Sequence, residues 1–168
     1  MAIKLIIATG ANYEVGQKGE LPWGYIKEDM EYFKEKTKGS IVVMGRKTYE
    51  SLPFDDGLPN RMNYVLTSNP EKFNDKQSCG VRSTYDLNKY CLFTTPVDVW
   101  VIGGTTVYRD MLKYVDEIHW TLVEGVFPDA DTHFDMEFLH NDLWDFQGWS
   151  WLVEDMVSVS VWKRKKNN

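Results

Sequence analysis

Cysteine is scarce in this chain of 168 residues: there are two, Cys79 and Cys91, and neither belongs to a Cys-x-x-Cys pair. This scarcity argues against a disulfide scaffold and against a zinc site of the usual spacing. Apolar runs are short as well, and none approaches the roughly 20 residues that span a bilayer. The apolar stretch near the start, Leu5 to Ala8, is too short for the apolar core of a signal peptide. We therefore expect a soluble, unexported protein in the reducing cytoplasm.

Positive charge is outnumbered, since 19 Lys and Arg residues face 25 Asp and Glu residues and the formal net charge is −6. Nonspecific binding to nucleic acid or to an anionic membrane depends on a positive field, so we expect neither partner. The histidines have no carboxylate at triad spacing, and no Gly-x-Ser-x-Gly turn is present, so nucleophilic hydrolysis has no support. We expect no metal site. The remaining expectation is a small-molecule site whose anionic ligands are bound by a local basic cluster.

The length fits one compact domain over residues 1–168. Short apolar runs alternate with helix-forming segments through most of the chain, whereas the last third has strands without long helices between them. We predict an α/β fold: a single domain with a central, mostly parallel twisted sheet flanked by helices and ending in antiparallel C-terminal strands. The predicted strands are 3–8, 41–44, 63–67, 97–102, 118–124, 149–154 and 156–163, and the predicted helices are 26–38, 46–52, 85–93 and 105–114.

A long irregular stretch follows the first predicted strand. Gly10, Gly16, Gly19 and Pro22 keep the chain from forming regular structure up to about Gly24. A loop of this length inside a compact domain is more often functional than a plain surface excursion, and both interpretations stay open at this point.

Two strand-to-helix turns have the composition of phosphate-binding sites. Gly45–Thr48 combines a glycine, two cations and a hydroxyl, and Gly103–Thr106 combines two glycines with two hydroxyls. The start of a helix presents N–H groups that bind anions. Neither turn matches the Rossmann or P-loop pattern, and one such turn alone is usually only a turn. Two of them in one parallel sheet favour a ligand with separated phosphates, such as a dinucleotide.

One acidic residue lies on the apolar face of the first predicted helix. Asp29 shares that face with Ile26 and Phe33, whereas Glu28 falls on the solvent face. A carboxylate at such a position is either a first-turn acid favoured by the helix dipole or a functional group in an apolar cleft. In the second case desolvation raises its pKa and fits it to bind a cationic heterocycle edge or to pass a proton.

Several segments taken in order resemble the dihydrofolate reductase family, and the resemblance covers nearly the whole chain. It implies the fold predicted above. The matching segments are Leu21-Pro22-Trp23 followed by Asp29 and Phe33, then Val43 to Ser51, then Val101 to Gly104 with Val107-Tyr108, and finally Asp131-Thr132-His133-Phe134.

The resemblance implies NADPH-dependent reduction of 7,8-dihydrofolate to 5,6,7,8-tetrahydrofolate, with hydride transfer to C6 and protonation at N5. It also implies a cytoplasmic monomer that supports one-carbon metabolism and thymidylate synthesis and binds antifolate inhibitors. A reductase of another heterocycle, of the riboflavin-pathway type, shares the fold but does not need Asp29 and Arg61 at these places. A noncatalytic nucleotide-binding or assembly protein with the same fold is the other alternative.

For the substrate, the resemblance makes Asp29 the active-site acid, Thr121 the hydroxyl that supports it and Trp23 its water-holding neighbour, and these three are the implied catalytic residues. Arg61 matches the arginine that binds the glutamate α-carboxylate, a bidentate task suited to a guanidinium. The implied substrate-binding residues are Ile6, Ala8, Asp29, Phe33, Leu52, Arg61, Ile102 and Thr121.

For the cofactor, the resemblance implies that both glycine turns bind NADPH and that Val15 and Gly16 belong to a mobile loop closing over the nicotinamide. It also implies a cis peptide bond between Gly103 and Gly104. Thr106 stands where many bacterial members have an arginine, so the preference for a 2′-phosphate rests more on Arg46. The implied cofactor-binding residues are Ala8, Val15, Gly16, Gly45, Arg46, Lys47, Thr48, Leu66, Thr67, Ser68, Ile102, Gly103, Gly104, Thr105, Thr106 and Val107.

Overall fold

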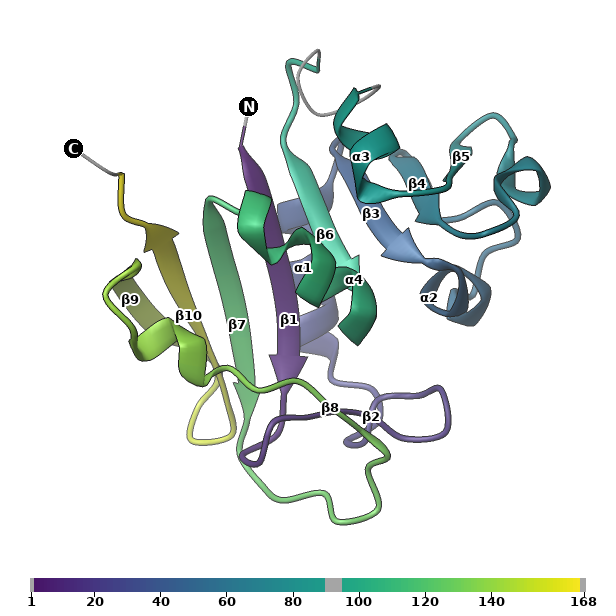
Figure 1. Cartoon of the computed structure of the whole chain (residues 1–168). Helices are drawn as coiled ribbons and strands as arrows, with labels where there is room; N and C mark the ends of the chain where they lie inside the picture. Colours follow the sequence, from purple (N-terminus) through teal and green to yellow (C-terminus); the bar gives the residue numbers. More distant parts are fainter. Residues whose placement is uncertain (1, 90–94, 167–168) are drawn as a thin grey trace. The chain divides into compact units, whose positions relative to one another are not determined.

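The computed structural model describes residues 2–89 and 95–166 (Figure 1). Its strands are β1 (Ile3–Thr9), β2 (Glu14–Gly16), β3 (Ile41–Gly45), β4 (Met62–Leu66), β5 (Ser78–Val81), β6 (Val99–Gly103), β7 (Glu117–Val123), β8 (Thr132–His133), β9 (Trp144–Val153) and β10 (Val157–Arg164). Its helices are α1 (Lys27–Thr37), α2 (Arg46–Ser51), α3 (Thr84–Leu87) and α4 (Thr105–Met111), with 3-10 turns η1 (Pro70–Phe73), η3 (Leu112–Tyr114) and η4 (Glu137–His140).

Eight strands form one sheet in the order β5-β4-β3-β6-β1-β7-β10-β9, and β2 pairs with β8 in a separate two-stranded sheet. The pairs β5–β4, β4–β3, β3–β6 and β6–β1 are parallel. The pairs β7–β10 and β10–β9 are antiparallel. The predicted α/β fold with antiparallel C-terminal strands is confirmed.

The chain divides into two compact units. The first unit comprises Met1–Leu5 with Glu35–Val115, and the second comprises Ile6–Lys34 with Asp116–Asn168. The prediction of one domain over residues 1–168 stays a prediction.

In the first unit, the central strands are apolar on both faces. Val42, Val43 and Met44 on β3 and Val99 and Val101 on β6 are fully buried. Parallel strands covered on both faces read as continuous apolar runs, which is why 41–44 was predictable as a strand. The carboxyl ends of β3, β4 and β6 are neighbours, because Gly45 pairs with Leu66 and Met44 pairs with Gly103.

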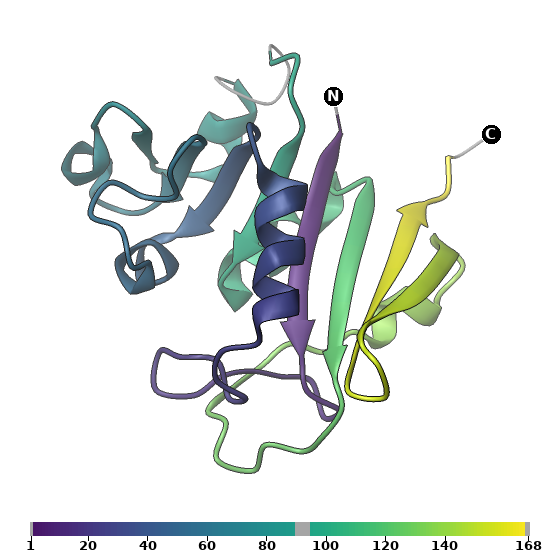
Figure 2. The ribbon, with the colours of Figure 1, turned by 180° about the vertical axis from the view of Figure 1, so that it is seen from behind.

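In the second unit, the first half of β10 alternates between buried and half-buried residues. Val157 and Val159 on β10 are buried, and Val159 pairs with the buried Thr121 of β7. Figure 2 shows α1 running alongside β1. Asp29 of α1 is buried and Glu28 is exposed, so the predicted phase of this helix is confirmed.

Several predicted boundaries are wrong. The stretch taken as irregular contains β2, because its backbone pairs with β8, a partner more than a hundred residues away. The strand β5 was not predicted, since Ser78–Val81 has no apolar run, and β9 begins at Trp144 rather than at 149. The helix predicted over 105–114 ends at Met111 and continues as η3. For the helix predicted over 85–93, α3 covers Thr84–Leu87, and residues 90–93, with Cys91, lie outside the described residues.

Candidate active site

Asp29 is a buried acid on α1 in the second unit. It lies in the first turn of α1, where the helix phase turns it away from solvent, and its residue is 9 % exposed. Burial raises the pKa of its carboxyl above the ordinary value, and a hydrogen bond from the Thr121 hydroxyl of β7 opposes part of that rise. Thr121 is itself buried. A carboxyl held this way keeps its proton to a higher pH than an exposed one, which suits it to proton transfer.

Trp23 supplies a buried polar atom near the start of α1. Its indole Nε1 is buried and has no hydrogen-bond partner within the described part of the chain. Its ring contacts Phe127 edge to face, with 5.5 Å between the ring centroids. A buried N–H that the protein leaves without a partner is normally bound by water or ligand, which fits the water-holding role that the resemblance implies.

Three apolar residues of the second unit were predicted to contact the substrate. Ile6 is buried on β1, Ala8 is half-buried on the same strand, and Phe33 is half-buried on α1. Ile6 and Ala8 are two positions apart on one strand and therefore share a face.

The glycine-rich loop is held by a carboxylate that sequence reasoning missed. Glu14 is 1 % exposed, and its oxygens accept the backbone N–H groups of Asn12 and Phe127 at 3.2 and 3.4 Å. Gly10 passes so close that a Cβ there would lie 2.0 Å from Glu14 Oε2. An ionisable residue inside a loop gives no sequence signal of burial, because the partners are backbone groups.

Val15 and Gly16, the predicted loop residues at the cofactor, lie on β2. Gly16 O accepts the N–H of Asp131 at 3.0 Å, and Lys18 N donates to Asp131 Oδ2 at 2.7 Å. The matched segment Asp131–Phe134 therefore fastens this loop, and the closing motion over a nicotinamide stays a prediction.

In the first unit, the structure brings the two glycine turns together. A Cβ on Gly45 would lie 3.2 Å from Val107 Cγ2, and one on Gly104 would lie 3.7 Å from Thr48 Oγ1. Gly45 and Gly104 are the N-cap residues of α2 and α4, and neither helix start has a side-chain cap. The peptide bond between Gly103 and Gly104 is cis, as predicted. Backbone N–H groups without a cap, lined by glycine, fit the phosphates of a dinucleotide.

The remaining cofactor candidates surround these turns at the carboxyl ends of the strands. Arg46 is exposed, and its Nη1 binds Glu50 Oε2 at 2.8 Å. Thr67 follows β4, is buried, and accepts the N–H of Asn69 at 3.2 Å. Leu66, Ile102, Thr48 and Thr105 are half-buried, and Lys47, Ser68 and Thr106 are exposed.

Arg61 is held at two points. Its Nε donates to Thr37 Oγ1 at 2.9 Å and its Nη1 donates to Pro59 O at 2.6 Å. Burial lowers the pKa of its guanidinium, which still remains charged at neutral pH. Leu52, also predicted to contact the substrate, is half-buried just after α2.

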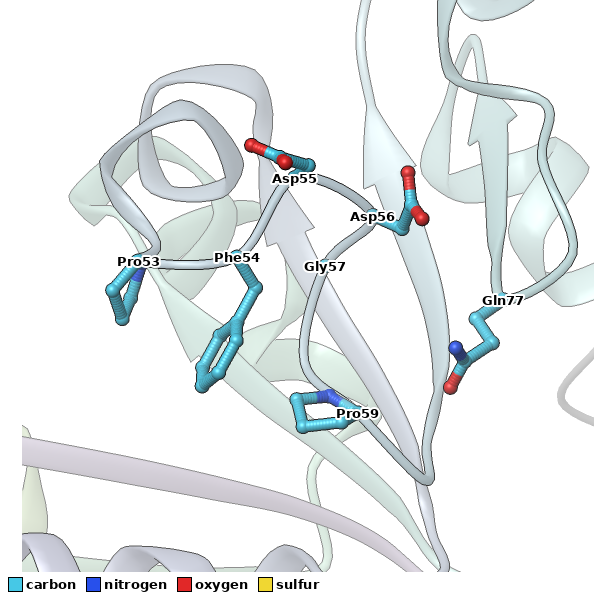
Figure 3. Close-up of a pocket in the computed structure, with 7 residues that line it drawn as sticks. All are labelled: Pro53, Phe54, Asp55, Asp56, Gly57, Pro59 and Gln77. Atoms are coloured by element: carbon cyan, nitrogen blue, oxygen red, sulfur yellow. The ribbon is translucent and has the colours of Figure 1, made fainter.

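A pocket in the first unit is lined in part by Pro59, the residue whose carbonyl accepts a hydrogen bond from Arg61. Its volume is about 380 Å³, and Figure 3 shows its acidic side chains on the segment that follows α2. Sequence reasoning did not predict it. The lining residues are Pro53, Phe54, Asp55, Asp56, Gly57, Pro59 and Gln77.

Comparison with known proteins agrees with this geometry. The family model described as "Dihydrofolate reductase" matches residues 2–148. The chain belongs to the dihydrofolate reductase family. It is 38% identical over 133 residues to the dihydrofolate reductase of Bacillus subtilis (strain 168), which covers 79% of this chain and 74% of the relative. It is 34% identical over 134 residues to that of Staphylococcus aureus (strain Mu50 / ATCC 700699), covering 80% and 78%.

A solved structure extends the similarity to nearly the whole fold. The dihydrofolate reductase from Enterococcus faecalis complexed with NADP(H) and RAB-propyl is 25% identical, with a TM-score of 0.83, covering 98% of this chain and 97% of the other. Family membership gives the activity of this chain as that of a dihydrofolate reductase, an NADPH-dependent oxidoreductase. Within the described residues, no helix is long and apolar enough to cross a membrane.

Proposed function

We propose that this protein reduces 7,8-dihydrofolate to 5,6,7,8-tetrahydrofolate with Asp29 as its acid and the glycine turns of its first unit as the NADPH site. The observation that carries this proposal is the burial of Asp29 beside Thr121, a single carboxyl kept away from water on the apolar face of α1. No second candidate function has an observation in its favour.

Asp29 binds and orients the pterin. In its ionised form the carboxylate accepts N–H bonds from N3 and the 2-amino group, which form a planar pair of donors suited to a carboxylate. The Thr121 hydroxyl fixes the carboxyl in one orientation. Because burial raises the carboxyl pKa, Asp29 can also hold the proton whose delivery, directly or through water at Trp23, promotes protonation at N5.

The glycine turns bind the cofactor. Gly45–Thr48 and Gly103–Val107 offer backbone N–H groups and hydroxyls to the phosphates, and Arg46 offers charge to the 2′-phosphate. When bound, NADPH supplies the hydride. Val15 and Gly16 exclude water from the nicotinamide, and Arg61 binds the α-carboxylate of the substrate.

The biological setting follows from this reaction. We place the enzyme in the cytoplasm as a monomer that supports one-carbon metabolism and nucleotide synthesis. Antifolates with a protonated diaminopyrimidine or pteridine ring should bind Asp29 as an ion pair.

The test is the loss of NADPH absorbance with two substrates, dihydrofolate and a heterocycle of the riboflavin pathway. Dihydrofolate should be consumed, and tetrahydrofolate should accumulate in a ratio of one to one with NADP. A riboflavin-pathway heterocycle should give no turnover. Turnover of that heterocycle without turnover of dihydrofolate, or binding of NADPH without any turnover, would refute the proposal in favour of one of its two rivals.

A further inference from the structure

A chain of partly buried polar contacts joins α1 to β7 outside the groups that touch substrate. The Tyr32 hydroxyl of α1 lies 2.5 Å from His119 Nδ1, and His119 Nε2 lies 2.6 Å from Glu117 Oε1. His119 is 5 % exposed. Lys163 of β10, paired with Glu117 across the sheet, has its Nζ 3.7 Å from Glu117 Oε2. The titratable groups of this chain of contacts are thus Tyr32, His119, Glu117 and Lys163.

The contact between Tyr32 and His119 joins the same two elements, α1 and β7, as the contact between Asp29 and Thr121. His119 and Thr121 are two positions apart on β7, so their side chains point to the same face. Asp29 and Tyr32 are three positions apart on α1, so they lie on neighbouring turns of one helix face. Thr121 bonds Asp29, and His119 bonds Tyr32. Two successive polar contacts therefore fix the same helix against the same strand.

The chemistry of the imidazole makes this second contact directional. A neutral histidine accepts at one ring nitrogen and donates at the other. In the tautomer that carries its proton on Nε2, the Tyr32 hydroxyl donates to Nδ1 and Nε2 donates to the Glu117 carboxylate. Lys163 lies 3.7 Å from the other oxygen of that carboxylate. A rotation or slide of α1 that moved Asp29 away from Thr121 would also break the Tyr32 contact.

We propose that His119, oriented by Glu117, is a positioning residue that acts through Tyr32 to keep Asp29 of α1 against Thr121. This proposal rests on the proposed function for its catalytic consequence. The structural part concerns the free protein and is tested without substrate.

The experiment compares Tyr32→Phe with Tyr49→Phe. Both remove one partly buried tyrosine hydroxyl, and Tyr49 is a matched control because its hydroxyl bonds Ser78 Oγ at 3.1 Å in the first unit. Two properties are measured for each: the titration of the Asp29 carboxyl by NMR in the free protein, and the pH profile of kcat with dihydrofolate.

Tyr32→Phe should move the Asp29 titration to higher pH, because a weakened bond from Thr121 no longer opposes the effect of burial. It should lower kcat roughly two- to tenfold, the range that corresponds to the loss of one neutral hydrogen bond, and leave KM for NADPH unchanged. His119→Phe should cause the same two changes. His119→Gln should keep both properties closer to those of the wild type, since the glutamine amide both accepts and donates hydrogen bonds.

An Asp29 titration and a kcat profile in Tyr32→Phe that match those of Tyr49→Phe would overturn the proposal, even if the melting temperature fell. If His119→Phe does not fold, the Asp29 titration and the kcat profile of Tyr32→Phe decide whether the proposal holds. If the wild-type protein does not reduce dihydrofolate, the proposed function fails, and the NMR titration still tests the positioning of Asp29.

Discussion

Replacing the buried acid by its neutral isostere, Asp29→Asn, should make the free protein more stable at neutral pH. The carboxyl is 9 % exposed, and burial raises its pKa more than the Thr121 bond lowers it. Each unit by which the folded-state pKa exceeds the unfolded-state pKa costs about 1.4 kcal/mol of stability once the group is ionised. Asparagine carries no charge, has nearly the same shape and still accepts the Thr121 hydroxyl.

The sign of the pH dependence follows from the raised pKa. The contribution of the Asp29 carboxyl to stability is fully present below its unfolded-state pKa and is lost as the pH rises through its folded-state pKa. The difference in unfolding free energy between Asp29→Asn and the wild type should therefore be constant at acid pH. It should grow in favour of the variant through this window and level off above it.

Urea unfolding followed by tryptophan fluorescence, repeated from about pH 3 to about pH 8, measures this difference at and above the ordinary pKa of an aspartate carboxyl. Glu28→Gln is the control, since Glu28 is exposed on the same turn and should show no growth of this kind. A free-energy difference for Asp29→Asn that stays flat with pH, or that shrinks as the pH rises, would refute the claim that burial raises the pKa of the Asp29 carboxyl.

Three further predictions concern the cofactor, the loop and the substrate tail. Arg46→Ala should weaken the binding of NADPH about tenfold or more and change the affinity for NADH little, as measured by titration of cofactor fluorescence. The reason is that a charge-assisted bond to the 2′-phosphate is worth about 1.5 to 3 kcal/mol, whereas the exposed ion pair with Glu50 contributes only a few tenths of a kcal/mol. Gly10→Ala should destabilise the protein by about 1 to 3 kcal/mol in urea unfolding, since its Cβ would lie 2.0 Å from Glu14 Oε2, and the cost should shrink in a Glu14→Ala background. Arg61→Lys should raise KM for dihydrofolate about tenfold and leave KM for NADPH unchanged, because lysine cannot form the bidentate contact. Equal losses for NADPH and NADH, an undiminished cost of Gly10→Ala beside Glu14→Ala, or an unaltered KM for dihydrofolate would each contradict the corresponding prediction.

The parts of the fold that sequence could predict are those whose signal is local. The apolar run at 41–44 and the glycine at 45 predict a covered strand and its turn, and the helical phase separates Asp29 from Glu28. In contrast, β5 was missed because Ser78–Val81 consists of small residues without an apolar run, and its pairing with β4 depends on neighbours rather than on its own composition. The short pair β2–β8 joins distant segments through backbone groups, which leave no pattern in the residues.

The candidate site divides in the same way. Glycines next to hydroxyls marked both turns, and cations marked the first of them. The structure adds that the two turns approach each other, at Gly45 and Val107. Glu14 and His119 were missed as structural groups, because ionisable side chains are expected at the surface and their partners come from other segments. The position of His119 two residues before Thr121 was the one available signal, since alternate residues of a strand share a face.

The central claim, that Asp29 is the acid of a dihydrofolate reductase, is tested most directly by the turnover of two variants at neighbouring positions. At neutral pH, Asp29→Asn should lower the rate of dihydrofolate reduction by about 10² to 10⁴, as is usual for general acid groups, with partial recovery at acid pH and nearly unchanged NADPH affinity. Glu28→Gln should keep the wild-type rate, because an exposed helix charge contributes only a few tenths of a kcal/mol. Full activity in Asp29→Asn together with loss of turnover in Glu28→Gln would contradict both the helix phase and the catalytic assignment.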